Sequence, residues 1–290
     1  MFTKFQDLID LSIKTNKNLH EIIIEWEMLE NGTDPILLKE ESIKIINQMI
    51  ESYREKLNNP SKSLTGWTGF NTEIYNEYKE NSLFNNLISK AILIALATSE
   101  NNASMGRVVA CPTAGSSGVV PGTLVSLYEE KNIPIEKLAE GLLISGAIGE
   151  FINRKGSLSG AVGGCQAEIG SATAMASGAI VYILDGDPDK VANAAALSMK
   201  FLMGLVCDPV GGFVEVPCVK RNPAGSVIAF TAADLAISGI KSAIPFDEVS
   251  QAMGKVGRSL PIDLRETGKG GIAATKTAKS LLDKFMGNKI

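Results

Sequence analysis

The 290-residue sequence contains a single histidine, His20, and this scarcity excludes the common hydrolytic chemistries. A Ser-His-Asp or Cys-His hydrolase must place a histidine beside its nucleophile. His20 lies instead in a densely charged N-terminal segment, and we expect it to be a solvated surface residue at the start of a helix. Any reaction that this chain performs therefore needs another source of reactivity.

The sequence also lacks an excess of positive charge and a long unbroken apolar run. The net charge is −4 and the pI is about 5.3, so we expect no nucleic acid partner. The first residues show no apolar signal-peptide centre. Of two uncharged runs, 108–128 is interrupted by prolines, and 169–184 is short and contains polar residues. We expect a cytoplasmic protein that does not enter a membrane.

Cysteine is sparse as well: the four residues are Cys111, Cys165, Cys207 and Cys218, without a C-x-x-C pair or a ferredoxin-type run. Cytosolic thiols stay reduced, so no disulfide framework is expected. Zinc is disfavoured, because a structural zinc site needs four ligands and no histidine is at hand. Free cysteines are often packed as small hydrophobes, and their spacing alone does not exclude that interpretation.

Helical patterns dominate the sequence. Residues 1–60 predict three charged helices, the third beginning at Asp34-Pro35, a capping residue followed by proline at the first helical position. From about residue 85 the chain is rich in Ala, Gly, Ser and Met, and 156–184 contains one charged residue, Glu168. Further helices are expected over 87–98, 138–152, 167–184, 191–206, 224–240, 246–258 and 272–286. Strand patterns are scarce, and Val214-Glu215-Val216 is the best candidate.

These patterns predict an all-α protein. Residues 1–60 form a charged N-terminal helical layer, and residues 61–290 form a multi-helix catalytic domain with a buried core rich in Ala and Gly. Helices that are apolar on all sides are buried helices, and small residues let their axes approach closely. We expect both parts to form one compact unit.

Three of the cysteines are bracketed by glycine or proline. Cys165 follows two glycines at the start of a buried helix, a position that favours thiolate. Cys207 precedes an Asp-Pro pair, where a helix is expected to end, and Cys218 follows a proline. Three thiolates held on separate turns suit a 4Fe-4S cluster with one open iron, which acts as a Lewis acid on a hydroxyl or carboxylate.

A second chemically suggestive segment is PTAGSSG at 112–118. It lacks the G-K-[ST] ending of a phosphate loop, so nucleotide binding is poorly supported. A Gly- and Ser-rich turn that leads into a helix presents N–H groups and hydroxyls to an anion. We expect it to bind a small carboxylate through Thr113, Ser116, Ser117 and Gly118. The alternative is a tight loop between packed helices.

Taken in order, several segments resemble the iron–sulfur L-serine dehydratases. They are NNASMGR (101–107), PTAGSSG (112–118), SGA (159–161), GGCQAE (163–168), CDPVGG (207–212), VPC (216–218), LRETG (264–268) and GGIA (270–273). The resemblance implies a 4Fe-4S cluster on Cys165, Cys207 and Cys218. It also implies a lyase of amino-acid degradation and gluconeogenesis that converts L-serine to pyruvate and ammonia. Cys111 matches no ligand position and is expected to be a packed thiol.

Two departures from the family pattern bear on partners and regulation. Single-chain members carry a second domain with a histidine-containing loop, so this chain resembles the separate α subunit of an oligomer whose β subunit supplies the general base. Within this chain Lys155 is the candidate base nearest in sequence to the cluster loop, although such lysines are usually solvated. Some members end in a cysteine that occupies the open iron. This chain ends Met-Gly-Asn-Lys-Ile, so that self-inhibition is not expected.

Three other functions stay open. The chain could be an iron–sulfur L-cysteine desulfidase, which acts on a thiol instead of a hydroxyl. A pyridoxal-phosphate dehydratase is less favoured, because it needs parallel strands and a Schiff-base lysine. The third is a non-catalytic, cluster-carrying helical subunit. A substrate panel distinguishes a desulfidase from a serine dehydratase. An open iron that responds to substrate would exclude a non-catalytic subunit.

Overall fold

The computed structural model describes residues 2–287, and within that range it contains helices and two isolated bridges but no strand. The helices are α1 Phe5–Thr15, α2 Leu19–Asn31, α3 Pro35–Asn58, α4 Asn71–Tyr78, α5 Asn86–Ala103, α6 Val119–Lys131, α7 Ile135–Lys155, α8 Gly160–Gly163, α9 Ser171–Leu184, α10 Pro188–Leu202, α11 Cys218–Ile237, α12 Phe246–Ser259 and α13 Lys276–Gly287. The all-α prediction is confirmed. The tail residues 288–290, on which the self-inhibition prediction partly depends, lie outside the described range.

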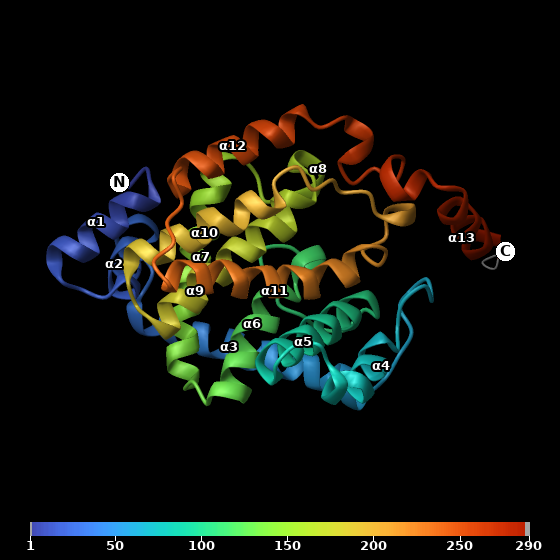
Figure 1. Ribbon diagram of the computed structural model, residues 1–290, viewed down its shortest axis with the longest axis horizontal. Helices are drawn as coiled ribbons and strands as arrows, with labels where there is room; N and C mark the ends of the chain where they lie inside the picture. The colour runs from blue at the N-terminus through green and yellow to red at the C-terminus, as the bar shows by residue number, and fades with distance from the viewer. Residues whose placement is uncertain (1, 288–290) are drawn as a thin grey trace.

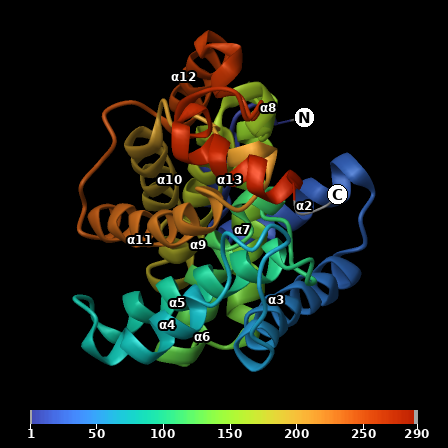
Figure 2. The ribbon, with the colours of Figure 1, turned by 90° about the vertical axis from the view of Figure 1, so that its right-hand side faces the viewer.

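Helix α9 lies at the centre of the fold, with α7, α10 and α11 packed around it (Figures 1 and 2). Small residues permit this crowding: a Cβ placed on Gly178 would lie 2.2 Å from Cδ1 of Ile148 on α7. With the π-helical turn before it, the stretch Gln166–Leu184 has a length and composition that could cross a membrane, but 94% of that window is buried inside the fold. It is the core helix that the Ala- and Gly-rich composition predicts.

The three N-terminal helices form as predicted and share a hydrophobic core with α7 and α12. Phe5 of α1 packs edge-on against Phe151 of α7 and Phe246 of α12, with ring centroids 5.7 and 5.2 Å apart. Asp34 caps α3 by accepting the N–H of Ile36 at 2.8 Å. These contacts hold α1–α3 against one side of the central helices.

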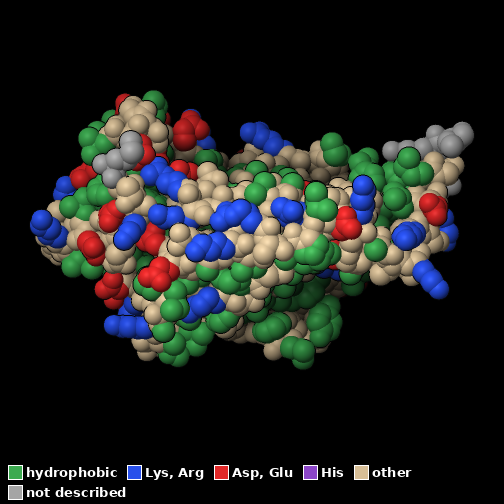
Figure 3. Space-filling view, turned by 90° about the horizontal axis from the view of Figure 1, so that it is seen from above, with side chains coloured by type: hydrophobic (Ala, Val, Ile, Leu, Met, Phe, Trp, Pro, Cys, Tyr) green, Lys and Arg blue, Asp and Glu red, His purple; other side chains and the backbone are tan. Residues whose placement is uncertain are grey.

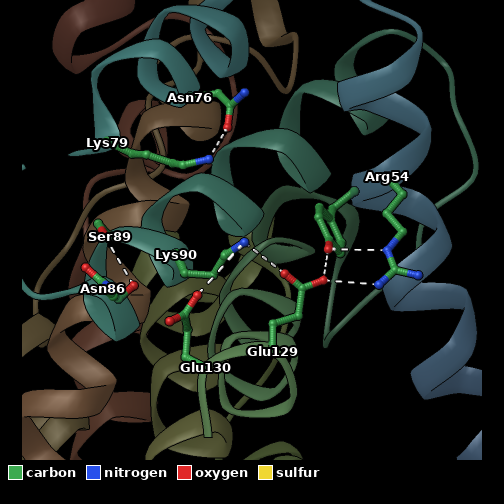
Figure 4. A network of polar contacts seen from close by, with 9 residues as sticks. Arg54, Asn76, Lys79, Asn86, Ser89, Lys90, Glu129 and Glu130 are labelled. Atoms are coloured by element: carbon green, nitrogen blue, oxygen red, sulfur yellow. Dashed lines mark hydrogen bonds and ion pairs between the residues drawn. The ribbon is translucent and has the colours of Figure 1, made fainter. Parts of the chain in front are cut away.

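Charged residues also join α3, α5 and α6 at one edge of the bundle (Figure 4). Glu129 of α6 accepts a hydrogen bond from the Tyr53 hydroxyl. Its carboxylate also forms ion pairs with Arg54 at 3.2 Å and Lys90 at 3.0 Å. Burial raises the pKa of Glu129. The network ties the edge helices together.

The loop before α4 is fixed by a buried carboxylate on α5. Glu100 accepts backbone N–H groups of Gly69, Asn71 and Thr72, and side-chain bonds from Asn71 and Thr72, at 2.6–3.2 Å. The neighbouring Lys56 is also buried. Its ammonium donates to the Ser61 carbonyl at 2.5 Å and to the Ser104 hydroxyl at 3.1 Å. Glu100 directly precedes the NNASMGR motif and Ser104 lies within it, so both sets of contacts tie this motif to the segment before α4.

Several local predictions are wrong. Residues 214–216 form a turn and not a strand, because the Val210 N–H donates to the Val216 carbonyl at 2.9 Å and closes the loop on itself. The helix expected over 191–206 ends at Leu202. The helix expected over 272–286 is divided into a 3₁₀ turn, Gly271–Ala274, and α13. Helix α4 was not predicted.

His20 is not the solvated residue that was predicted. It stands near the start of α2 as expected, but its side chain is 12% exposed, and Nδ1 lies 2.5 Å from the Tyr182 hydroxyl. That hydroxyl donates to Glu140 at 3.1 Å. Burial lowers the pKa of His20. The packing of α2 against α7, which no local pattern reveals, covers the imidazole.

Beyond α12 the chain runs across the upper face in Figure 1 and ends in α13, which lies apart from the central bundle. Helix α13 is attached through an aromatic cluster in which Trp67, Phe213 and Phe285 pack edge-on, with centroids 5.4–5.9 Å apart. The connecting segment, 260–275, passes directly beside Cys207.

Candidate active site

Cys165, Cys207 and Cys218 are all buried, with exposures of 3%, 3% and 7%, and come from three separate elements. Cys165 directly precedes the π-helical turn Gln166–Gly170, and Cys218 is the first residue of α11. Cys207 lies in an extended segment: its N–H donates to the Leu264 carbonyl at 2.9 Å, and its carbonyl accepts the Glu266 N–H at 2.7 Å. The prediction that Cys207 ends a helix is wrong, because α10 stops five residues earlier.

The side chains of these cysteines approach one another. A hydrogen bond between the thiols of Cys207 and Cys165 lowers the pKa of Cys165 and raises that of Cys207, and the nearby Arg221 also favours the Cys165 thiolate. Burial raises the pKa of Cys218 to about 12, with a further contribution from the charge of Cys165. The lowered pKa of Cys165 agrees with the sequence argument, although its main cause is Cys207 and not a helix dipole.

Glu168 stands beside the thiols and was not selected from the sequence. It is 8% exposed and accepts the Thr113 hydroxyl at 2.7 Å through Oε1, while its Oε2 lies 3.6 Å from Sγ of Cys207. A Cβ on Gly160 would lie 2.5 Å from that Oε2, so glycine is needed there to admit the carboxylate. Burial raises the pKa of Glu168. The signal was available, since Glu168 is the single charge in 156–184.

A second carboxylate, that of Glu266, completes a set of donors suited to a metal. One ligand atom each from Glu168, Cys207 and Glu266 lies within 4.8 Å of the other two. Thiolates bind iron and zinc readily, whereas carboxylates prefer harder ions, so a mixed set of this kind is compatible with iron. Together with the thiols of Cys165 and Cys218, the donor chemistry fits an iron–sulfur cluster.

The predicted carboxylate loop is adjacent to this set, but its groups differ in availability. Thr113 faces Glu168, whereas the Ser116 hydroxyl bonds within the loop, to the Cys111 carbonyl at 3.3 Å. The Ser117 hydroxyl is buried and has no hydrogen-bond partner among the described residues. The N–H of Gly118 is already used, because it donates to Asn222 at 2.9 Å.

Two side chains of α11 hold these segments together. Asn222 is buried and donates at 2.9 Å to the carbonyls of both Gly115 and Cys218, so it joins the loop to the third cysteine. Arg221 donates at 2.9 Å to the Asp208 carboxylate and to the Val206 carbonyl. Neither residue was identified from the sequence, because their partners are distant along the chain.

Two further predicted residues lie elsewhere. Lys155 is in the last turn of α7, and its ammonium donates to the Thr3 carbonyl at 3.1 Å, on the N-terminal segment. Its assignment as a base stays a prediction. Cys111 is buried as expected for a packed thiol, and burial raises its pKa to about 12.

Comparison with known proteins yields one consistent group of relatives. The family profile described as "Serine dehydratase alpha chain" matches residues 14–273. The "Probable L-serine dehydratase, alpha chain" of Bacillus subtilis is 42% identical, over 99% of this chain and 96% of that protein. The "L-serine dehydratase, alpha chain" of Peptoniphilus asaccharolyticus is 38% identical over 99% of both. A Helicobacter pylori "L-serine dehydratase" is 34% identical over 94% of this chain, but over 62% of that protein.

Proposed function

The chain belongs to the serine dehydratase alpha chain family, and from this premise we propose that it is the catalytic subunit of an enzyme that deaminates L-serine to pyruvate and ammonia. The observation that carries the proposal is the position of Glu168. It touches Thr113 of the Gly- and Ser-rich loop on one side and Cys207 on the other. The loop and the cysteines therefore belong to one site.

In this proposal Cys165, Cys207 and Cys218 hold a 4Fe-4S cluster. Their burial, their mutual proximity and the neighbouring cation Arg221 support it, because a buried group of thiolates needs positive charge nearby. When bound, a cluster with one iron free of protein ligands supplies a Lewis acid for the substrate hydroxyl.

The chain's own residues would bind and orient the substrate. Thr113 fixes the Glu168 carboxylate by donating a hydrogen bond to Oε1. Oε2 is therefore held toward the cysteines, where it can accept a hydrogen bond from the substrate. Asn222 keeps the Gly115–Gly118 turn in register with Cys218. The buried surroundings exclude bulk water, which strengthens each of these polar contacts.

We propose further that the general base comes from a separate β subunit. The names of two relatives specify an alpha chain, and the Helicobacter relative contains a large region with no counterpart here. The single histidine of this chain bonds to Tyr182 near the C-terminal end of α9, whereas Cys165 lies before the N-terminal end of that helix. The functional unit would be a cytoplasmic hetero-oligomer.

The test is a substrate panel on the two chains purified together without oxygen. L-serine should yield pyruvate and ammonia in equal amounts, and L-threonine should react more slowly or not at all. Release of sulfide from L-cysteine at a higher kcat/KM would favour the desulfidase alternative. A cluster spectrum that does not respond to any amino acid would favour a cluster-carrying subunit without catalytic activity.

A further inference from the structure

Within the described part of the chain, one cation beside the site lacks an ion-pair partner. The Arg221 guanidinium already has partners, because it forms an ion pair with Asp208 and donates to the Val206 carbonyl. Arg265 is different: its Nε is buried without a hydrogen-bond acceptor, and across residues 2–287 its guanidinium forms no ion pair. Arg265 is partly exposed as a residue, but a buried donor such as its Nε is unfavourable without an acceptor, so it is expected to meet an anion in the working enzyme.

The backbone places Arg265 beside the proposed cluster. Arg265 and Cys207 form an isolated parallel bridge, made by the bonds from Cys207 N–H to Leu264 and from Glu266 N–H to Cys207. Residues paired across such a bridge start their side chains on the same face. The Arg265 side chain therefore starts from the face that carries the Cys207 thiol.

Electrostatics indicates what kind of anion belongs there. The substrate carboxylate is repelled by Glu168 and Glu266, which flank Cys207, and so it requires a cation. In the Gly- and Ser-rich loop the N–H groups of Ser116, Ser117 and Gly118 are occupied, which leaves the uncharged Ser117 hydroxyl as an unpartnered donor among the described residues. Figure 3 shows Lys and Arg side chains across the middle of the upper face, while the acidic side chains gather mainly toward its left end, so the middle of this face favours the approach of anions.

We infer that Arg265 binds the α-carboxylate of the amino-acid substrate through a fork of two hydrogen bonds. Guanidinium and carboxylate groups match in this planar geometry, which an ammonium group cannot reproduce. The Glu266 carboxylate, which lies within 4.8 Å of the ligand atoms of Cys207 and Glu168, is then the candidate acceptor for the substrate ammonium. The inference rests on the proposed function and identifies the group of the chain that selects an α-amino acid.

The test measures binding of L-serine and of L-serinamide, which lacks the carboxylate, to the cluster-loaded complex of both chains by calorimetry. The unsubstituted complex should bind L-serine about ten- to a hundredfold more tightly than the amide. Arg265→Gln should lose this preference by weakening L-serine alone, and Arg265→Lys should retain part of it. The matched control is Lys269→Gln, which removes an exposed charge from the same segment and should behave like the unsubstituted protein.

The outcomes separate the two hypotheses. If Arg265→Gln keeps the preference for L-serine, or weakens both ligands equally, the carboxylate assignment is wrong and Arg265 has a structural or partner-binding role. The same conclusion follows if the unsubstituted complex does not prefer the carboxylate. If the unsubstituted complex prefers L-serine but forms no pyruvate, the proposed reaction is wrong while the carboxylate assignment of Arg265 is retained. Cluster absorption and the melting temperature verify assembly, and the lysine variant carries the test if the glutamine variant does not assemble.

Discussion

The Thr113 hydroxyl donates a 2.7 Å hydrogen bond to Oε1 of Glu168, although the two residues are 55 positions apart in the chain. The bond joins the loop that precedes α6 to the turn that follows Cys165. Because Oε1 is held by Thr113, the other oxygen of Glu168 faces the Cys207 thiol at 3.6 Å. One side chain of the loop thus orients a carboxylate of the site.

The first prediction tests this contact. Thr113→Val keeps the shape of the side chain but removes the donor, and a hydrogen bond to a charged group is worth about 1.5–3 kcal/mol. We expect kcat/KM for L-serine to fall about ten- to a hundredfold, with iron content unchanged. The control is Thr231→Val, an exposed position on α11 whose hydroxyl bonds only within its helix. Equal activity of both variants would show that Glu168 does not need Thr113.

The second prediction concerns the Ser117 hydroxyl, which is buried and unpartnered in the described part of the chain. Removal of an unsatisfied buried group does not destabilise the fold, so Ser117→Ala should keep the melting temperature or raise it slightly. If the hydroxyl binds substrate, KM for L-serine should nevertheless rise about tenfold. Steady-state kinetics together with thermal melting measure both effects. An unchanged KM would leave the loop with a packing role.

The third prediction concerns metal binding. We expect the unsubstituted chain to hold about four irons and four sulfides. Most of both should be lost in each of the variants Cys165→Ser, Cys207→Ser and Cys218→Ser, because each removes one of three thiolate ligands. Cys111→Ser should retain both, since burial raises the pKa of Cys111 without a contribution from another thiol, in contrast to Cys218. Iron and acid-labile sulfide are measured after purification without oxygen. Full iron content in the Cys207 variant would refute the ligand set.

The fourth prediction concerns Glu100 and acid stability. Burial alone would raise the pKa of Glu100, but hydrogen bonds from Thr72, Asn71 and Gly69 outweigh it and lower the pKa below its ordinary 4.5. A lowered folded-state pKa contributes stability above pH 4.5 that is lost as the pH falls through the folded value. Glu100→Gln should therefore lower Tm at pH 7 by about 3–10 °C.

The same comparison provides its own control. The difference in Tm between the Glu100→Gln variant and the unsubstituted chain should shrink as the pH falls below 4.5, because the native carboxylate becomes protonated. Glu77→Gln, at an exposed position of α4, should leave Tm unchanged at both pH values. A difference that stays constant with pH would mean that the charge of Glu100 contributes nothing.

Most of the helices could be predicted from the sequence because they obey local rules. The Asp34-Pro35 pair gives the start of α3, and the uncharged stretch around α9 gives the core helix. The turn at 214–216 could not be predicted, since Glu215 is held by Thr65 through two hydrogen bonds from a distant loop. Such long-range side-chain contacts override a weak local β preference. The division of the chain at residue 60 stays a prediction.

The site shows the same limit. The cysteines and the loop are visible as motifs because glycine and proline bracket them. The residues that organise them are not, because Asn222 and Arg221 look like ordinary polar residues of a helix until their partners are known. Glu168 is the exception, as a lone charge in an apolar stretch. An isolated acidic residue in a buried apolar stretch therefore indicates a candidate site residue, in addition to those that motifs identify.

The last prediction is that this chain binds the cluster but scarcely turns over L-serine by itself. Removal of a Cα proton needs a base of suitable pKa held close to the substrate. His20 does not meet this need, because its Nδ1 bonds to Tyr182 and burial lowers its pKa. Lys155 bonds to the N-terminal segment, and Arg221 is paired with Asp208. We therefore expect activity at least about a hundredfold below that of the two-chain complex, by comparison with the loss of a general base.

Pyruvate formation is measured for the chain alone, with its iron content verified, and after addition of a candidate β chain. His20→Gln should not change the activity of the complex, which separates the imidazole from the chemistry. Full turnover by the chain alone, free of contaminating dehydratase, would mean that the base is one of its own residues, with Glu168 and Lys155 the first to substitute.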